Sequence, residues 1–102
     1  SKYLDGYTID MFCSSTSSET DRDALVSELL DNSLPGSLLA ERHGRFLRFD
    51  VPKLPSLGLG HTFRRLQALK GSCSFPLENY SISQCSLEQV FIKLTKQNNF
   101  VD

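Results

Sequence analysis

The stretch Arg45-Phe46-Leu47-Arg48-Phe49-Asp50-Val51 is the clearest strand signal in the chain, and the fold can be built outward from it. Leu47, Phe49 and Val51 recur at every second position, with charged residues between them. Phe46 is the apolar exception on the other face. A period of two predicts a strand that buries one face and leaves the other open.

A hairpin is expected immediately before this strand. His43-Gly44 is its predicted tip, because glycine takes a positive φ at little steric cost. Residues 37–42 supply the partner strand, and Pro52 and Pro55 close the strand that follows the tip.

Two more strands are predicted, one near each end of the chain. Tyr7, Ile9 and Met11 alternate with Thr8 and Asp10, which predicts a strand over residues 7–12. A further strand is expected over residues 77–83, where Tyr80 and Ile82 alternate with serines.

Apolar residues at helical spacing predict three helices. The first covers residues 20–30, with Thr20 as its N-cap. The second begins at Ser56 or Leu59 and ends at Lys70, before Gly71. The third begins with a capping box formed by Ser86 and Gln89. The apolar stripes of these helices are, in turn, Leu25, Val26, Leu29 and Leu30; Leu59, Phe63, Leu66 and Leu69; and Leu87, Val90, Phe91 and Leu94.

The element order is therefore β-α-β-β-α-β followed by a helix. It predicts an α+β, ferredoxin-like plait with a four-stranded antiparallel sheet, two helices on one face, and an added C-terminal helix. We expect one domain over residues 1–102, ordered over about residues 6–97 and frayed at both ends.

Composition describes an ordinary soluble domain. Of the 102 residues, 39% are hydrophobic and 23% charged, which argues against collagen-like, low-complexity and disordered chains. The net charge of −1 argues against a protein that coats nucleic acid. No apolar run is long enough to span a bilayer, and the first residues lack the pattern of a secretory signal. Cys13, Cys73 and Cys85 are expected to be reduced thiols.

No group of residues has a catalytic or metal-binding pattern. His43 and His61 have no cysteine or carboxylate at metal spacing, and no phosphate-binding loop or nucleophile elbow is present. Cys85 precedes a predicted helix start but has no general base nearby in sequence. The serine-rich stretch 14–18 is expected to be a loop, in which nothing selects a phosphorylation site. We therefore expect no enzymatic activity, no cofactor and no metal.

Three binding hypotheses follow from the residues. The segment His43–Phe49 loosely echoes the aromatic strand of an RNA-recognition motif, although Leu47 stands where that motif has a glycine. A plait of this kind can also sense small molecules. A basic set could meet anionic lipid head groups or an acidic protein surface: Arg42, Arg45, Arg48, Arg64 and Arg65.

Three segments resemble the regulatory domains of A-subfamily ABC transporters. Residues 80–91, Y-S-I-S-Q-C-S-L-E-Q-V-F, resemble the segment that closes those domains. The opening D-G-Y-T-I at residues 5–9 is similar to their entry. Leu34-Pro35-Gly36-Ser37 with Glu41-Arg42-His43 is similar to their F-P-G-S-x-x-x-[EK]-[RK]-H pattern. Cys85 and Leu34 depart from the usual threonine and phenylalanine, and both changes are compatible with packing.

The resemblance favours the second, carboxyl-terminal regulatory domain, at the cytoplasmic face of a multi-pass membrane protein. It implies a non-catalytic domain that packs against nucleotide-binding domains and the other regulatory domain, and so modulates their dimerisation, the ATPase cycle and lipid transport. This chain has no Walker or signature sequence, and no nucleic-acid partner is expected. The residues expected to make these contacts are Ser86, Leu87, Val90, Phe91, Leu94 and Phe100.

Overall fold

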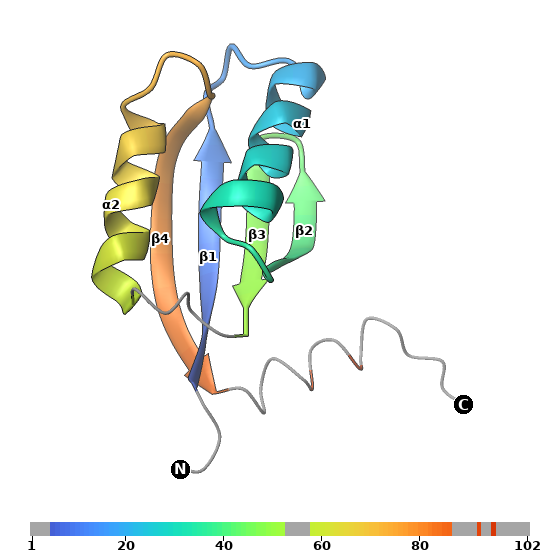
Figure 1. Ribbon diagram of the computed structural model, residues 1–102. Coiled ribbons are helices and arrows are strands. Elements are labelled where there is room, and N and C mark those ends of the chain that lie inside the picture. The colour runs from blue at the N-terminus through green and yellow to red at the C-terminus, as the bar shows by residue number, and fades with distance from the viewer. Residues whose placement is uncertain (1–4, 53–57, 87–91, 93–94, 96–102) are drawn as a thin grey trace.

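A computed structural model describes residues 5–52 and 58–86, together with residues 92 and 95. The order of its elements is the predicted β-α-β-β-α-β (Figure 1). The elements are β1 (Asp5–Cys13), α1 (Glu19–Glu28), the π-helical turn η1 (Leu29–Ser33), β2 (Leu38–His43), β3 (Phe46–Val51), α2 (Gly58–Lys70) and β4 (Leu77–Ser86).

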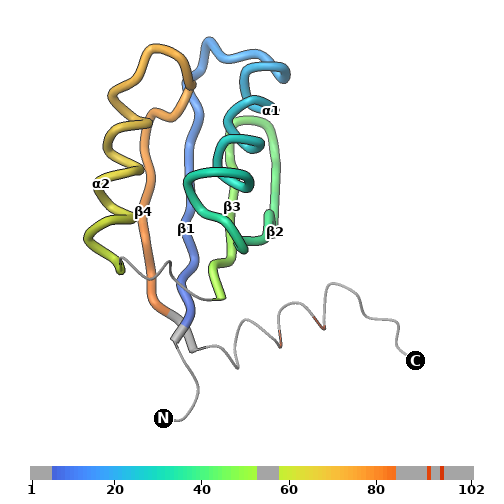
Figure 2. The backbone as a smooth tube through the Cα atoms, in the orientation of Figure 1, coloured from blue at the N-terminus to red at the C-terminus, as the bar shows by residue number. Residues whose placement is uncertain are grey.

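The four strands form one antiparallel sheet in the order β2-β3-β1-β4. Both helices lie on the same face, α1 in front of β3 and β2, and α2 beside β4 (Figures 1 and 2). This arrangement confirms the predicted ferredoxin-like α+β plait.

The core lies between the sheet and the two helices. Leu47, Phe49 and Val51 of β3 are buried there as predicted, because strand residues two apart share a face. Ile9 on β1 pairs in register with Phe49 and is also fully buried. The helices complete this core with Leu25, Val26 and Leu29 from the α1 side and Leu66 and Leu69 from α2.

The hairpin between β2 and β3 turns where the sequence predicts. Gly44 has a φ of +56°, the left-handed conformation that glycine adopts most readily. In β2 the register shifts between Leu39 and Glu41. As a result Leu39 and Arg42 share the helix-covered face with Phe49 and Leu47, their partners on β3.

The predicted N-cap of α1 is wrong. Ser18, not Thr20, is the N-cap, and its extended backbone precedes Glu19. The Asp21 N–H donates to Ser18 Oγ at 3.0 Å, while the Ser18 N–H donates to Asp21 Oδ2 at 3.0 Å. Because Ser18 and Asp21 satisfy two backbone donors reciprocally, the helix starts there rather than after Thr20.

At its other end α1 continues into η1. The Leu34 N–H donates to the Leu29 carbonyl at 2.7 Å, and Leu34 itself is fully buried. The chain then leaves through Gly36, whose φ of +88° permits the sharp exit. The helical segment thus extends to Ser33, past the predicted end at Leu30.

The predicted apolar stripe of α2 is only half buried. Leu66 and Leu69 are buried with Thr62, but Leu59 and Phe63 are 36% and 44% exposed. The buried stripe is therefore rotated from the predicted one. Figure 1 shows α2 beside β4 at the border of the sheet, so the sheet covers only part of the helix.

Strand β4 continues to Ser86, three residues beyond the predicted end, and the backbone of Ser86 pairs with Asp5. Of the third predicted helix, the structure describes only Ile92 and Thr95, both with helical backbone. Among the described helices, none has the length and apolar character that crossing a membrane requires.

Candidate functional site

The predicted contact residues fall almost wholly outside the described part of the chain. Leu87, Val90, Phe91, Leu94 and Phe100 lie outside it, and Ser86 is described only through its backbone at the end of β4. The candidate surfaces are therefore built from the described residues: the α1–β2 contact, the open sheet face, the loop cavity and the outer side of α2.

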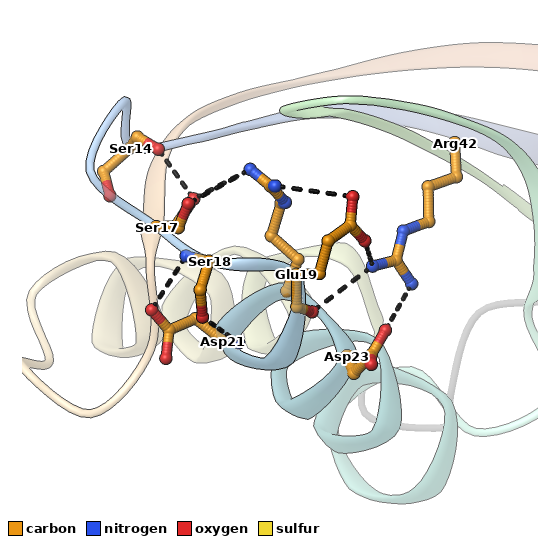
Figure 3. A network of polar contacts seen from close by, with 8 residues as sticks. Ser14, Ser17, Ser18, Glu19, Asp21, Asp23 and Arg42 are labelled. Carbon is orange, nitrogen blue, oxygen red and sulfur yellow. Dashed lines mark hydrogen bonds and ion pairs between the residues drawn. The ribbon is translucent and has the colours of Figure 1, made fainter.

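A polar network joins α1 to β2 (Figure 3). Arg42 of β2 points toward the helix, where its Nη2 lies 2.8 Å from Glu19 Oε1 and its Nη1 2.8 Å from Asp23 Oδ1. The hydrogen bond to Asp23 is the main reason why the pKa of Arg42 is raised, with smaller contributions from both carboxylates. Arg42 thus ties the edge strand to the first turn of the helix.

Arg22 holds the preceding loop to the same helix. Its Nη1 donates to the Ser17 carbonyl and to Ser17 Oγ, each at 3.3 Å, while Ser17 Oγ donates to the Ser14 carbonyl at 2.7 Å. The Arg22 side chain is only 12% exposed. The expected serine-rich loop is therefore a turn held by hydrogen bonds between Ser14 and Ser17.

The face of the sheet away from the helices, called here the open face, carries a charged row, although Thr8 and Asp50 on that face are buried rather than exposed as the strand pattern predicts. Arg48 Nε lies 2.7 Å from Asp10 Oδ1, and Arg48 Nη1 lies 3.4 Å from Glu41 Oε2. These residues share one face because Arg48 pairs in register with Asp10 on one side and with Glu41 on the other. The hydrogen bond from Arg48 to Asp10 is the main cause of the raised pKa of Arg48.

An aromatic pair lies beside that row. The rings of Phe12 and Phe46 are 5.3 Å apart between centroids, and the Arg48 guanidinium lies 5.4 Å from the Phe46 centroid. The sequence predicts Phe46 on this face but not Phe12, which follows Met11 in β1 and therefore points to the other face of the sheet from Met11. RNA stacking calls for aromatics beside available cations, whereas Arg48 is engaged by two carboxylates.

The structure does not gather the five arginines of the lipid hypothesis on one surface. Arg42 and Arg48 point to opposite faces of the sheet, and each pairs with two carboxylates. Arg65 donates to the Asn32 carbonyl at 3.2 Å, whereas Arg45 is in the β2–β3 turn and Arg64 is exposed on α2. Their separation weakens the case for a single anionic ligand.

A cavity of about 530 Å³ lies between the loop after β1 and the loop after α2. Its lining is rich in hydroxyl groups, including those of Ser14, Ser17 and Ser72, and it also contains Lys70 and the exposed Cys73. Among the described residues that line it there is no histidine. Within the described part of the chain, no cluster of histidine, cysteine and carboxylate side chains could hold a metal ion.

The thiol of Cys13, unlike that of Cys73, is buried. It is fully buried at the end of β1, and burial raises its pKa, an effect partly opposed by Arg22, Arg42 and Arg45. A raised pKa keeps the thiol protonated and unreactive, so Cys13 is a core residue.

Comparison with known proteins identifies the family to which this chain belongs. The family profile described as "ABCA1-like, C-terminal R1 regulatory domain" matches residues 4–84. The retinal-specific phospholipid-transporting ATPase ABCA4 of Bos taurus is 36% identical over 100 residues, which cover 97% of this chain and 4% of that protein.

Two further relatives are also similar to this chain over most of its length. The human ATP-binding cassette sub-family A member 6 is 37% identical over 79 residues, covering 78% of this chain and 5% of that protein. The cholesterol transporter ABCA5 of Mus musculus is 31% identical over 102 residues, covering 100% and 6%. The chain thus spans only 4% to 6% of the length of these relatives. The family match over residues 4–84 confirms the resemblance seen in the sequence: the chain belongs to the ABCA1-like family of C-terminal R1 regulatory domains, a family of regulatory rather than catalytic domains of A-subfamily ABC transporters.

Proposed function

We propose that this chain is a non-catalytic domain that regulates an ATP-driven lipid transporter by docking. It would contact the nucleotide-binding domains and the other regulatory domain on the cytoplasmic side, and so modulate their dimerisation, the ATPase cycle and lipid transport. The observation that carries the proposal is the match to a regulatory-domain family over residues 4–84. Lipid as the transported substrate is supported by the names of two relatives, a phospholipid-transporting ATPase and a cholesterol transporter.

The described surface supports a docking role. Five large apolar side chains of the plait are exposed, and two of them, Leu59 and Phe63, lie one helical turn apart on α2, where adjoining apolar groups can form a contact surface. The five are Phe12, Leu38, Leu39, Leu59 and Phe63 among the residues of the described sheet and helices. Docking by Ser86, Leu87, Val90, Phe91, Leu94 and Phe100 remains part of the proposal.

The proposal is tested on the full transporter, purified and reconstituted in liposomes, with and without residues 1–102. A docking interface that biases two domain arrangements needs a coupling free energy of about 1–3 kcal/mol. Deletion should therefore change the ATPase rate by roughly 5- to 150-fold if that bias controls the slow step. Lipid movement should change in the same direction.

The control is the transporter with Ser15→Ala, a change at an exposed loop residue that should leave both rates as they are. If the ATPase rate and lipid movement stay the same after deletion, while the protein is still folded and inserted, the domain is not regulatory. A rate change without any change in cross-linking between the nucleotide-binding domains would contradict the dimerisation step.

A further inference from the structure

Strand β4 is an edge strand that has little of the usual protection against added strands from Asn79 onward; at its start, a register shift against β1 leaves Glu78 without a register partner. Within the described part of the chain its ten residues pair with β1 alone, in nine register pairs. The opposite edge strand, β2, has six residues, a register shift after Leu39, and a charged run from Glu41 to His43. Between Glu78 and Ser83, β4 has no proline and no lysine, and Glu78 is its one charged residue. Such an edge is open to another extended segment.

Helix α2 lies along this edge (Figures 1 and 2). Leu59, Phe63, Gln67 and Lys70 fall on one side of the helix, because residues three and four apart are neighbours. Figures 1 and 2 show α2 beside β4 at the border of the sheet, on the side away from β1.

Three contacts between α2 and β4 fix that placement. The ring of Phe63 lies 6.2 Å from the ring of Tyr80 between centroids, and Tyr80 Oη donates to Gln67 Oε1 at 2.7 Å. Lys70 Nζ lies 3.5 Å from Asn79 Oδ1. We call the surface made by Leu59, Phe63, Gln67 and Lys70 together with residues 78–83 the β4–α2 edge.

The β4–α2 edge is apolar at one end and basic around it. Phe63 and Leu59 are 44% and 36% exposed. Helix α2 contains Arg64, Arg65, Lys70 and His61 but no acidic residue, and the side chains of Arg64 and Lys70 are exposed. A carboxylate on a partner would therefore find complementary charge near an apolar contact.

We propose that the β4–α2 edge binds an extended acidic segment of the same transporter, which adds to β4 as a fifth strand. This inference rests on the proposed docking function and specifies one of its interfaces. Backbone hydrogen bonds to β4 would supply the register, an apolar side chain would pack on Phe63, and a carboxylate would face Arg64 or Lys70.

The charge distribution disfavours a second copy of this chain as the occupant. If two β4 strands paired about a two-fold axis, the two α2 helices would meet side by side. Each helix carries basic residues and no acidic ones, so their like charges would repel. An acidic segment is not repelled by α2, and Glu78 is the one acidic residue of the β4–α2 edge that it would meet.

Hydrogen–deuterium exchange of the intact transporter tests the pairing. In an antiparallel edge strand about half of the amides point away from the neighbouring strand and exchange readily. If a fifth strand is present, nearly all amides of residues 78–83 exchange slowly, and Phe63→Ser or Arg64→Glu restores fast exchange in about half of them, at least tenfold faster. The matched control is Phe12→Ser, which removes an equally exposed ring, 44%, from the open face.

A photo-cross-linking amino acid at position 63 identifies the occupant in the same purified transporter. A link to an extended segment that contains aspartate or glutamate supports the proposal. A link to residues 58–86 of a second copy overturns it, as does linking no stronger than from position 12. Fast exchange of half the amides in the unmodified transporter also overturns it.

The two proposals fail separately. If deletion of residues 1–102 changes the ATPase rate but Phe63→Ser leaves β4 exchange unchanged, the domain is regulatory and the β4–α2 edge is not its interface. If β4 is paired as proposed but deletion changes neither rate, the edge is an assembly contact and the regulatory function is wrong.

Discussion

Ser18 decides where α1 begins, through two hydrogen bonds of 3.0 Å shared with Asp21. Ser18→Ala removes the side-chain acceptor and leaves the Asp21 N–H without that partner. We expect the free energy of unfolding to fall by about 1 kcal/mol, a typical cost for losing a serine cap. Urea denaturation of the chain measures this change.

Ser15→Ala is the matched control, since Ser15 is an exposed serine of the same loop. It should change the free energy of unfolding by less than about 0.5 kcal/mol. Equal losses in the two variants would show that the cap contributes nothing beyond the loop composition.

Glu28, at the end of α1, makes the stability of the folded chain depend on pH. Asn32 Nδ2 and Ser33 Oγ each donate to its carboxylate at 2.9 Å, which holds its pKa below the ordinary value of 4.5. The folded state therefore gains stability above pH 4.5 and loses it as the pH falls through the lower folded pKa. Glu28→Gln should flatten the stability profile in that acidic window. Identical profiles for Glu28→Gln and the unmodified chain would contradict this assignment.

At the scale of elements, two glycines should respond to the same substitution with opposite signs. Gly44 has a φ of +56° in the β2–β3 turn, so Gly44→Ala should destabilise the chain by about 1–2 kcal/mol. Gly60 lies within α2 without a positive φ, and a Cβ there would meet only Arg64 Nη1, at 3.6 Å. Gly60→Ala should stabilise by roughly 0.5–1 kcal/mol. Thermal unfolding of both variants decides the signs, and a loss in both would contradict the conformational argument.

Strand periodicity predicted more of this fold than helix periodicity did. Alternation identified the buried face of β3, because a strand has only two faces and one was apolar. In α2, spacing grouped Leu59 and Phe63 with Leu66 and Leu69, but it could not show where the sheet ends beneath the helix. Burial of the stripe depends on that distant edge, which local sequence does not specify.

The sequence predicted only some of the residues that form the candidate surfaces, because their contacts depend on how distant elements pack. The S-x-x-D pattern of Ser18 and Asp21 is a capping signal that the prediction of Thr20 as the N-cap misses. The partners of Arg42 could not be predicted, because Glu19 and Asp23 approach it only after β2 has packed beside α1. Phe63 shares the apolar spacing of Leu66 and Leu69, and only its 44% exposure shows it to be a surface residue.

At the scale of the whole molecule, the domain can regulate only while its sheet and helices stay together. Phe49 lies fully buried on β3, between Ile9 of β1 and Leu39 of β2 in the register of the sheet. Phe49→Ala should cost about 3–5 kcal/mol, a large fraction of the 5–15 kcal/mol that stabilises a domain. Phe49→Leu keeps most of the apolar contact and should cost roughly 1–2 kcal/mol.

In the full transporter, Phe49→Ala should therefore have the same effect as deletion of the domain. We expect its ATPase rate to shift to that of the transporter lacking residues 1–102, while limited proteolysis shows cleavage within the domain. Phe49→Leu should keep both the normal rate and resistance to protease. Regulation by a folded docking surface would be contradicted if the Phe49→Ala domain were cleaved readily while the ATPase rate stayed normal, because an unfolded chain cannot present the β4–α2 edge or any other fixed contact.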